Sequence, residues 1–301
     1  MVIRVRVPAT SANLGPGFDA VGVALGLFLE VDMSLEGSGY QVSFSGEGAD
    51  YLRVAIGDNL VYRAARKVFD ETGRHPEGVY LKIRNAIPVG KGLGSSAAAT
   101  VAGLWGANAL LGCPLTEDEL LRMAVKMEGH PENVVPAVVG GLAVAMVDQG
   151  TVLYRRLDLP VGLRFLLAVP DFGVATEHAR RALPAMVEMG DAVYNLQRAC
   201  FFLASMLTGQ LDHLDRAMRD RLHQPYRKMF VAGFDDVVEG AVRAGALGAA
   251  MSGSGPAVLA LARGETEGIA RAMREGFERY GVRSAVCELE PCVHGVVIEE
   301  E

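Results

Sequence analysis

The chain has 301 residues, of which 50% are hydrophobic and 22% charged, and its formal net charge at pH 7 is −7. This balance is typical of a globular protein with ample apolar material for a core, and the length suits one large domain or two modest ones. The acidic net charge argues against a broad nucleic-acid-binding surface.

The four cysteines form no CxxC pair, and no histidine stands at metal-ligand spacing from them, which argues against structural zinc and a disulfide framework. Residues 1–8 alternate between apolar and charged or polar side chains as a strand does, unlike a signal peptide. The longest apolar stretch, 97–111, is short for a membrane span and is better explained as a buried helix. We therefore expect a soluble cytoplasmic protein that binds neither nucleic acid nor a membrane.

In chain order, the first half is rich in strands. Apolar and polar alternation predicts strands at 2–8, 21–33, 40–45, 78–85, 141–147, 151–157 and 163–169. Helical periodicity predicts helices at 58–72, 95–111 and 116–128. Asp58 is the expected N-terminal cap of the first helix and Gly73 ends it, while Thr116 and Glu119 form a capping-box pattern.

After Pro170 the periodicity becomes mainly helical. Helices are expected at 176–183 and 190–208, followed by shorter ones to about 243. The remainder is predicted as strand 246–251, turn 252–256, strand 257–262, helix 265–280 and strand 282–289. The pattern predicts an α+β fold with two domains, 1–160 and 161–301, each built of two layers.

The most informative segment is a glycine-rich loop between a predicted strand and a predicted helix. It consists of Pro88, Val89, Gly90, Lys91, Gly92, Leu93, Gly94, Ser95, Ser96, Ala97 and Ala98. Glycines at alternate positions permit positive φ and let the backbone approach a bulky anion. Free amides at a helix start, together with the helix dipole, favour a phosphate there. Judged alone, the loop could equally be the structural start of a helix.

Two familiar nucleotide-binding loops do not fit this segment. A Walker A loop requires serine or threonine after Gly-Lys, whereas Lys91 is followed by Gly92. The dinucleotide fingerprint is GxGxxG, and the spacing here is GxGxG without an acidic residue about 20 positions further on. Nicotinamide-dependent chemistry is therefore disfavoured.

Three motifs carry a resemblance to a known family. The loop at 88–97 is similar to the phosphate-binding signature of the galactokinase, homoserine kinase, mevalonate kinase and phosphomevalonate kinase superfamily. Residues 8–19 resemble the homoserine kinase version of the first motif, and 248–256 resemble the third motif. The resemblance implies an N-terminal domain like the second domain of ribosomal protein S5 and a ferredoxin-like C-terminal domain. It also implies a homodimer.

The resemblance implies that ATP, with Mg²⁺, phosphorylates L-homoserine to O-phospho-L-homoserine in threonine biosynthesis. In the family, a serine and a glutamate matched by Ser96 and Glu128 hold the magnesium, which prefers oxygen ligands. Asn133 stands where mevalonate kinases carry an aspartate thought to act as the base. Since an amide cannot take a proton, we expect catalysis by positioning and charge stabilisation.

The same resemblance assigns acceptor contacts, because arginine forks suit a carboxylate. Asp19 and Asn13 would hold the hydroxyl and amino ends of the acceptor, and Arg180 and Arg227 match two substrate arginines. The acceptor residues it gives are Asn13, Asp19, His130, Asn133, Thr176, Arg180, Arg227 and Gly253. The catalytic residues it gives are Glu128, Ser96, Asn133 and Asp19. Asn59 is a candidate contact beside adenine.

Purely structural interpretations stay open for several of these residues. Asp19 could be a turn residue, His130 a structural histidine and Gly253 part of a hairpin turn. Lys91 could contact phosphate or be simply exposed, and a helical arginine is ordinarily solvated.

Two other functions also stay open. One is a kinase of the same superfamily that acts on mevalonate or shikimate, although Asn133 and the absence of lysine from 13–19 argue against mevalonate. The other is a non-catalytic nucleotide-binding module, against which the presence of Ser96, Glu128 and Asp19 argues.

Overall fold

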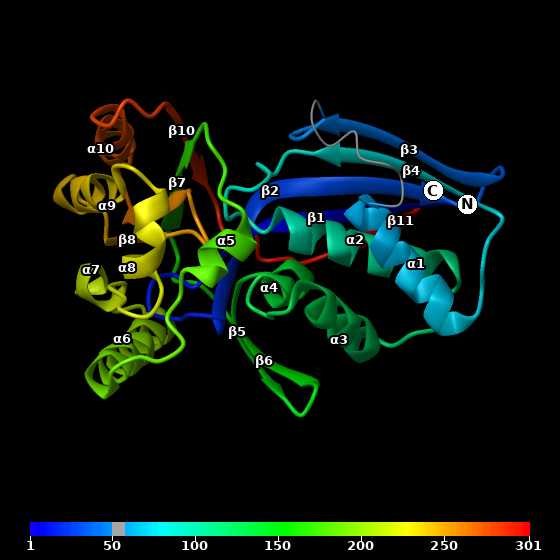
Figure 1. The fold of residues 1–301 in the computed structure, drawn as a ribbon, viewed down its shortest axis with the longest axis horizontal. Coiled ribbons are helices and arrows are strands. Elements are labelled where there is room, and N and C mark those ends of the chain that lie inside the picture. The colour runs from blue at the N-terminus through cyan, green and yellow to red at the C-terminus, as the bar shows by residue number, and fades with distance from the viewer. Residues whose placement is uncertain (50–57) are drawn as a thin grey trace.

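The computed structural model describes residues 1–49 and 58–301, which form two sheets with helices packed against them (Figure 1). The larger sheet has the order β11-β1-β2-β4-β3, with β5 paired to β2 and β6 to β5. The smaller sheet has the order β10-β7-β9-β8. All described pairings are antiparallel except that of β3 with β4.

The bounds of the strands are as follows. The larger sheet contains β1 (Val2–Ala12), β2 (Val21–Ser34), β3 (Gly39–Gly46), β4 (Gly78–Asn85), β5 (Leu142–Asp148), β6 (Thr151–Leu157) and β11 (Val297–Glu300). The smaller sheet contains β7 (Leu163–Pro170), β8 (Gly248–Met251), β9 (Val258–Arg263) and β10 (Ser284–Leu289).

Four helices lie on one side of the larger sheet (Figure 1), namely α1 (Leu60–Thr72), α2 (Ser95–Leu110), α3 (Glu117–Glu128) and α4 (Val134–Val139). The smaller sheet packs against α9 (Phe234–Arg243) and α10 (Glu267–Glu278) through a separate apolar cluster. The other helices are α5 (Thr176–Arg181), α6 (Met189–Thr208), α7 (Leu214–Ala217) and α8 (Gln224–Arg227).

Helix α2 is the central element of the larger layer, because it packs between the sheet and α1. A Cβ atom on Gly103 would overlap the carbonyl oxygen of Val61 in α1, and one on Gly106 would press against Met33 in β2. Most α2 residues are buried, which explains an apolar stretch without a polar face. Among residues 1–49 and 58–301, no helix is long and apolar enough to cross a membrane.

Most predicted elements agree with the structure to within a few residues. The predicted cap Asp58 was wrong: the N-cap of α1 is Asn59, whose side-chain oxygen accepts from the backbone N–H of Tyr62 at 3.1 Å. Two elements were not predicted. Helix α4 is rich in valine and contains Pro136, both poor helix signals. Strand β11 is wholly exposed and shows no alternation of burial.

The predicted boundary at residue 160 falls between β6 and β7. Strand β11 nevertheless pairs with β1, so the end of the chain returns to the larger sheet. The two-domain division therefore stays a prediction for residues 1–160 and 161–301, while the predicted mixture of helix and sheet is confirmed.

A polar cluster links three adjacent strands of the larger sheet. Asp32 in β2 accepts from Arg4 Nε in β1 at 2.7 Å and from Arg84 Nη1 in β4 at 2.9 Å. Asp32 is only 8% exposed. Burial alone would raise the pKa of Asp32, but the hydrogen bonds from Arg84 and Arg4 lower it to about 2.

We predict that Asp32→Asn lowers the free energy of unfolding by about 2 kcal/mol near pH 7. Since the folded pKa lies below the unfolded value of 3.8, this stabilisation is present above 3.8 and is lost as the pH falls through about 2. Urea unfolding of both proteins at several pH values should show the difference shrinking on acidification. Glu30→Gln, at a more exposed carboxylate beside Arg84, should cost less than about 1 kcal/mol. If the difference in the free energy of unfolding between wild type and Asp32→Asn did not change with pH, the lowered pKa of Asp32 would be contradicted.

Candidate functional site

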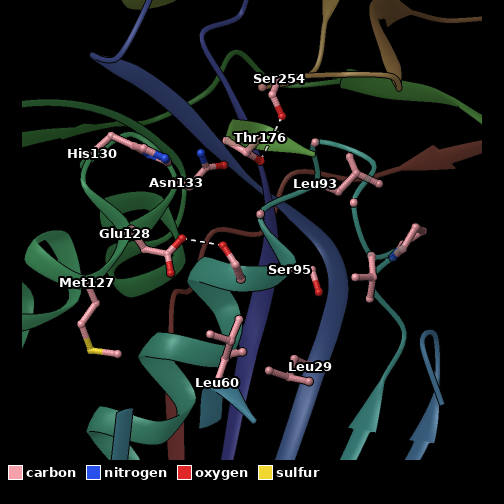
Figure 2. Close-up of a pocket in the computed structure, with 18 of the residues that line it drawn as sticks. Leu29, Leu60, Leu93, Ser95, Met127, Glu128, His130, Asn133, Thr176 and Ser254 are labelled. Atoms are coloured by element: carbon pink, nitrogen blue, oxygen red, sulfur yellow. Dashed lines mark hydrogen bonds between the residues drawn. The ribbon is translucent and has the colours of Figure 1, made fainter. Parts of the chain in front are cut away.

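A cavity of about 850 Å³ is lined by the glycine-rich loop, the end of α3, the loop after β1, helix α5 and the turn after β8. Figure 2 shows Leu29, Leu60 and Met127 at one end of the cavity. His130 and Thr176 lie at the other end, and the start of α2 lies between the two ends. The cavity therefore has an apolar end, a polar end and a helix N-terminus between them.

The backbone of the glycine-rich loop packs directly against neighbouring segments, with no room for side chains at two of its glycines. Gly90, Gly92 and Gly94 all have left-handed φ, of 69°, 78° and 69°. A Cβ atom on Gly92 would overlap the Ser252 carbonyl oxygen, and one on Gly94 would overlap Thr10 Oγ1. These contacts hold the loop against both sheets, and only glycine fits them.

Helix α2 begins directly after this loop and carries no side-chain cap. Its N-cap residue, Gly94, has no side chain that could accept from the first amides of the helix. Ser95 and Ser96, the first two helical residues, line the cavity. An uncapped helix start facing a cavity presents free N–H groups and the positive end of the helix dipole to an anion.

Most of the predicted loop residues line the cavity, but three do not. Those that do are Pro88, Val89, Gly90, Gly92, Leu93, Gly94, Ser95 and Ser96. Ala97 and Ala98 are fully buried beneath the helix start. Lys91 points away, because its ammonium donates to the carbonyl oxygens of Pro170 at 2.8 Å and Phe172 at 2.7 Å. Burial lowers the pKa of Lys91, and a phosphate contact by its side chain has no support.

Glu128 is the last residue of α3 and faces the start of α2. Its Oε2 accepts from Ser96 Oγ at 2.5 Å (Figure 2), and its Oε1 accepts from Thr100 Oγ1 at 2.8 Å. Gly129, with φ of 86°, ends α3 immediately afterwards and fixes the position of the carboxylate. Thr100 was missed by the sequence analysis, although its place one turn after Ser96 puts it on the same helix face.

The residues around Asn133 form a second polar group. Asn133 Oδ1 accepts from Thr10 Oγ1 and its Nδ2 donates to Glu132 Oε1, both at 3.0 Å. His130 Nδ1 lies 2.9 Å from the same Glu132 oxygen. Burial acts to lower the pKa of His130, but the Glu132 carboxylate raises it overall. His130 and Asn133 thus share one buried carboxylate.

Glu132 was not predicted as a site residue, yet it lines the cavity and is only 3% exposed. Within the described ranges its Oε2 has no hydrogen-bond partner. A buried carboxylate oxygen without a donor is costly, so the arrangement favours a cationic ligand group at this place. The one sequence signal was an acidic residue beside an otherwise apolar segment, 134–139.

The loop after β1 holds Asn13 and Asp19 through an unusual backbone. Asn13 and Asp19 have positive φ of 73° and 55°, and the Asp19 N–H donates to Asn13 Oδ1 at 3.1 Å. The Asp19 carboxylate forms a bidentate ion pair with the Arg180 guanidinium, and each of its two hydrogen bonds is 2.9 Å long. The sequence analysis assigned Asp19 and Arg180 to different chemical groups of the acceptor, whereas in the structure their side chains contact each other.

Arg227 is a buried cation with an unusual set of partners. It is 2% exposed, and its guanidinium donates to the Gly253 carbonyl at 3.1 Å and to His223 Nδ1 at 3.3 Å. No carboxylate of the described residues forms an ion pair with it. Burial and the nearby Arg180 both lower the pKa of Arg227. A buried guanidinium without a counter-ion favours an anionic ligand group.

The remaining predicted residues lie at the two ends of the cavity. Thr176 Oγ1 and Ser254 Oγ are 3.3 Å apart at the polar end (Figure 2), beside Gly253. Asn59 lines the apolar end next to Leu60, and its side-chain oxygen is used as the cap of α1. Its amide nitrogen is the group left to contact a ligand.

Comparisons with known proteins identify the family of this chain. Residues 59–141 match the family described as "GHMP kinases N terminal domain", and residues 202–279 match "GHMP kinases C terminal". A homoserine kinase from Moorella thermoacetica is 47% identical, over 98% of this chain and 99% of its own length. One from Carboxydothermus hydrogenoformans is 43% identical, over 98% of this chain and 96% of its own.

Solved structures of related kinases also resemble this chain. The crystal structure of a homoserine kinase from Cytophaga hutchinsonii superposes with a TM-score of 0.88 at 30% identity, covering 99% of this chain and 97% of that chain. The L. major mevalonate kinase, solved in complex with R-mevalonate, has a TM-score of 0.70 at 17% identity and covers 95% of each chain. At that identity the second likeness concerns the fold alone.

Proposed function

The chain belongs to the homoserine kinases of the GHMP kinase family, and from this premise we propose that the cavity is the active site of an ATP-dependent phosphorylation of L-homoserine. The product is O-phospho-L-homoserine, an intermediate of threonine biosynthesis. The observation that carries the proposal is the uncapped start of α2, which faces the cavity beside the Ser96–Glu128 hydrogen bond. Four free cysteines are consistent with a cytoplasmic location.

The shape of the cavity supports one orientation of ATP. The apolar end, with Leu29 and Leu60, suits the adenine ring, and the amide nitrogen of Asn59 is close enough to that end to contact it. The triphosphate then lies along the glycine-rich loop, with its terminal groups at Ser95 and Ser96. The backbone amides and helix dipole stabilise its charge there.

The donor set beside the phosphate position fits Mg²⁺. Glu128 and Ser96 offer only oxygen atoms, which hard cations prefer, and Mg²⁺ usually takes its remaining ligands from phosphate and water. Within the described part of the chain there is no cluster of three or more histidine, cysteine or acidic residues that could bind a metal without the nucleotide. When bound, the ion neutralises charge on the phosphate oxygens. Thr100 fixes the other oxygen of Glu128 and so orients the carboxylate.

The polar end of the cavity matches an amino acid with both charges. Arg227 and Arg180 supply guanidinium groups for the acceptor carboxylate. Glu132 and Asp19 supply carboxylates for the acceptor ammonium, and the unpartnered Glu132 oxygen is buried. The Asp19–Arg180 pair is partly exposed, so its rearrangement around a bound zwitterion costs little.

The acceptor hydroxyl then lies near Asn133, between the ammonium site and the start of α2. Asn133 cannot act as a base, because an amide takes no proton and its oxygen already accepts from Thr10. The reaction we propose is a direct transfer in which the hydroxyl oxygen forms a bond to the terminal phosphorus of ATP. The bond from that phosphorus to the bridging oxygen breaks and ADP leaves, while the hydroxyl proton passes to an oxygen of the transferred phosphoryl group and from there to solvent. Positioning and charge stabilisation supply the catalysis, as a loose transition state permits.

We also propose that the protein is a homodimer that assembles through helix α6, which lies beside α7 and away from α1 and α3 (Figure 1). Met189, Val193, Leu196 and Leu207 are between 43% and 78% exposed, and together with the exposed Cys200 and the partly buried Leu203 they repeat at alternating intervals of four and three residues. The 20-residue helix is about 30 Å long. Monomeric proteins rarely expose apolar patches above a few hundred Å². A second copy fits, because one continuous stripe is complementary to itself across a two-fold axis.

The substrate is tested by steady-state assays with ATP and, in turn, L-homoserine, mevalonate, shikimate and galactose. We expect turnover with homoserine to exceed that with each of the other three. Better turnover on another acceptor would overturn the substrate assignment. Tight ATP binding without ADP release in the presence of any acceptor would instead indicate a non-catalytic nucleotide-binding module.

We predict that Glu128→Gln lowers kcat by about 100-fold, because the proposed metal site loses a carboxylate ligand. Thermal unfolding should change little, since the amide can still accept from Ser96 or Thr100. Glu117→Gln, in the exposed first turn of the same helix, is the matched control and should leave kcat unchanged. An unchanged kcat in Glu128→Gln would remove Glu128 from the metal site.

We predict that Arg180→Leu raises KM for homoserine at least about tenfold and leaves KM for ATP unchanged, because one charge-assisted bond to the acceptor is lost. Arg181→Leu is the matched control, since Arg181 is exposed and pairs with Glu177. Initial-rate kinetics with each substrate varied separately would measure both constants. A selective loss of ATP affinity would show that Arg180 has been misplaced.

We predict that Leu196→Glu converts the dimer to a monomer, because two carboxylates would meet in an apolar interface. Light scattering coupled to gel filtration would measure the mass of each variant. Val161→Glu changes an even more exposed apolar residue outside α6 and should remain dimeric. A wild-type monomer at tens of micromolar, or a dimeric Leu196→Glu variant, would contradict the α6 interface.

A further inference from the structure

His223 is a fully buried histidine that the reaction described above does not use. It is the N-cap residue of α8, and its ring is stacked on Phe18 with 5.1 Å between the ring centroids. Phe18 directly precedes Asp19 in the loop after β1, and Arg227 follows His223 by one helical turn. The imidazole thus stands between two groups of residues that line the polar end of the cavity.

The two hydrogen bonds of the ring fix its protonation. Nε2 lies 2.8 Å from the Gly15 carbonyl oxygen, which can only accept, so Nε2 carries the hydrogen. Nδ1 lies 3.3 Å from Arg227 Nη1, and a guanidinium can only donate, so Nδ1 carries the lone pair. Both contacts together require the neutral imidazole with its proton on Nε2.

The charges around the ring are consistent with this state. Asp220 Oδ2 is 3.6 Å from Nε2, but that carboxylate already accepts from the backbone N–H groups of Leu222, His223 and Gln224 and from Asn195. The other charged groups near the ring are Arg227 and Asp19. Burial lowers the pKa of His223, against the opposing effect of Asp220.

We propose that His223 is a positioning residue of the acceptor site, which fixes the loop after β1 through one ring nitrogen and the Arg227 guanidinium through the other. The first bond ends on Gly15, within the loop whose left-handed residues Asn13 and Asp19 face the cavity. The second leaves Arg227 Nη2 as the guanidinium nitrogen without a partner among the described residues.

The Gly253 carbonyl oxygen also connects the loop after β1 to Arg227, because it accepts from both Asn13 Nδ2 at 3.0 Å and Arg227 Nη1 at 3.1 Å. A shift of the imidazole would therefore move the loop and the arginine together. The inference rests on the proposed function, in which Arg227 binds the carboxylate of the acceptor.

Two substitutions separate the two ring contacts. His223→Gln can place an amide nitrogen near the Nε2 position and keep the bond to Gly15, but it loses the acceptor for Arg227. His223→Asn can place an oxygen near the Nδ1 position and keep the acceptor, but it loses the bond to Gly15. The acceptors compared are L-homoserine and 3-aminopropan-1-ol, which is the same molecule with hydrogen in place of the carboxylate.

We expect His223→Gln to raise KM for homoserine about tenfold, as loss of one hydrogen bond to a charged group does, with KM for ATP unchanged. Binding of 3-aminopropan-1-ol, measured as its inhibition constant against homoserine, should not change. In an Arg227→Leu background, His223→Gln should add no further loss, because the two residues act through one contact. His223→Asn should weaken both acceptors, since it releases the loop.

Equal weakening of both acceptors by His223→Gln, or additive losses with Arg227→Leu, would overturn the proposal. A measurement on the unaltered protein is independent of how the variants fold. Nitrogen NMR of ¹⁵N-histidine-labelled protein should show a neutral His223 ring protonated on Nε2, and a charged ring or the other tautomer would overturn the proposal as well. If the wild-type protein itself does not phosphorylate homoserine, the proposed function fails instead.

Discussion

The arrangement of this protein depends on one constraint: the start of α2 must be buried at its sides and left open at its tip. Glycines 92 and 94 meet this constraint on the loop side, because they permit contacts with the backbone of Ser252 and the side chain of Thr10 that no other residue allows. Small residues further along α2 meet it on the helix side, by letting α1 and the sheet approach. Among the described residues no side chain caps these helix amides, and in the proposed function the phosphates of ATP are the anion that they bind.

A similar constraint applies at the polar end of the cavity, where charged side chains are buried without a bound ligand. Arg227 has no carboxylate partner among the described residues, and Glu132 has an oxygen without a donor. Each is unfavourable alone, and in the proposed function both are satisfied by one molecule that carries a carboxylate and an ammonium. Specificity for a small zwitterion can thus arise from buried charged groups that lack partners when the zwitterion is absent. A molecule without the matching charges would leave them without partners.

The sequence predicted local features well and contacts between distant segments poorly. Strand alternation, the capping box at Thr116 and the helix-ending Gly73 depend on neighbours in the chain, and the elements they predict are present. The loop at 88–98 was recognised by its motif, but the direction of the Lys91 side chain depends on carbonyl groups about 80 residues away. Glu132, Thr100 and His223 were missed, because what marks them is burial and the partner each finds from another element. The pairing of Asp19 with Arg180 spans 161 positions and has no local signal either.

The last strand gives the molecule an order of assembly. β11 pairs with β1 in antiparallel register, and Val2 and Glu301 exchange two backbone hydrogen bonds, so the two ends of the chain lie side by side (Figure 1). During synthesis β1 leaves the ribosome long before β11 and must keep one edge unpaired until β11 has been translated. The larger sheet is therefore completed only after the smaller sheet has been translated. Because Val2 and Glu301 are adjacent, a short covalent link between β1 and β11 would hold this edge of the larger sheet closed.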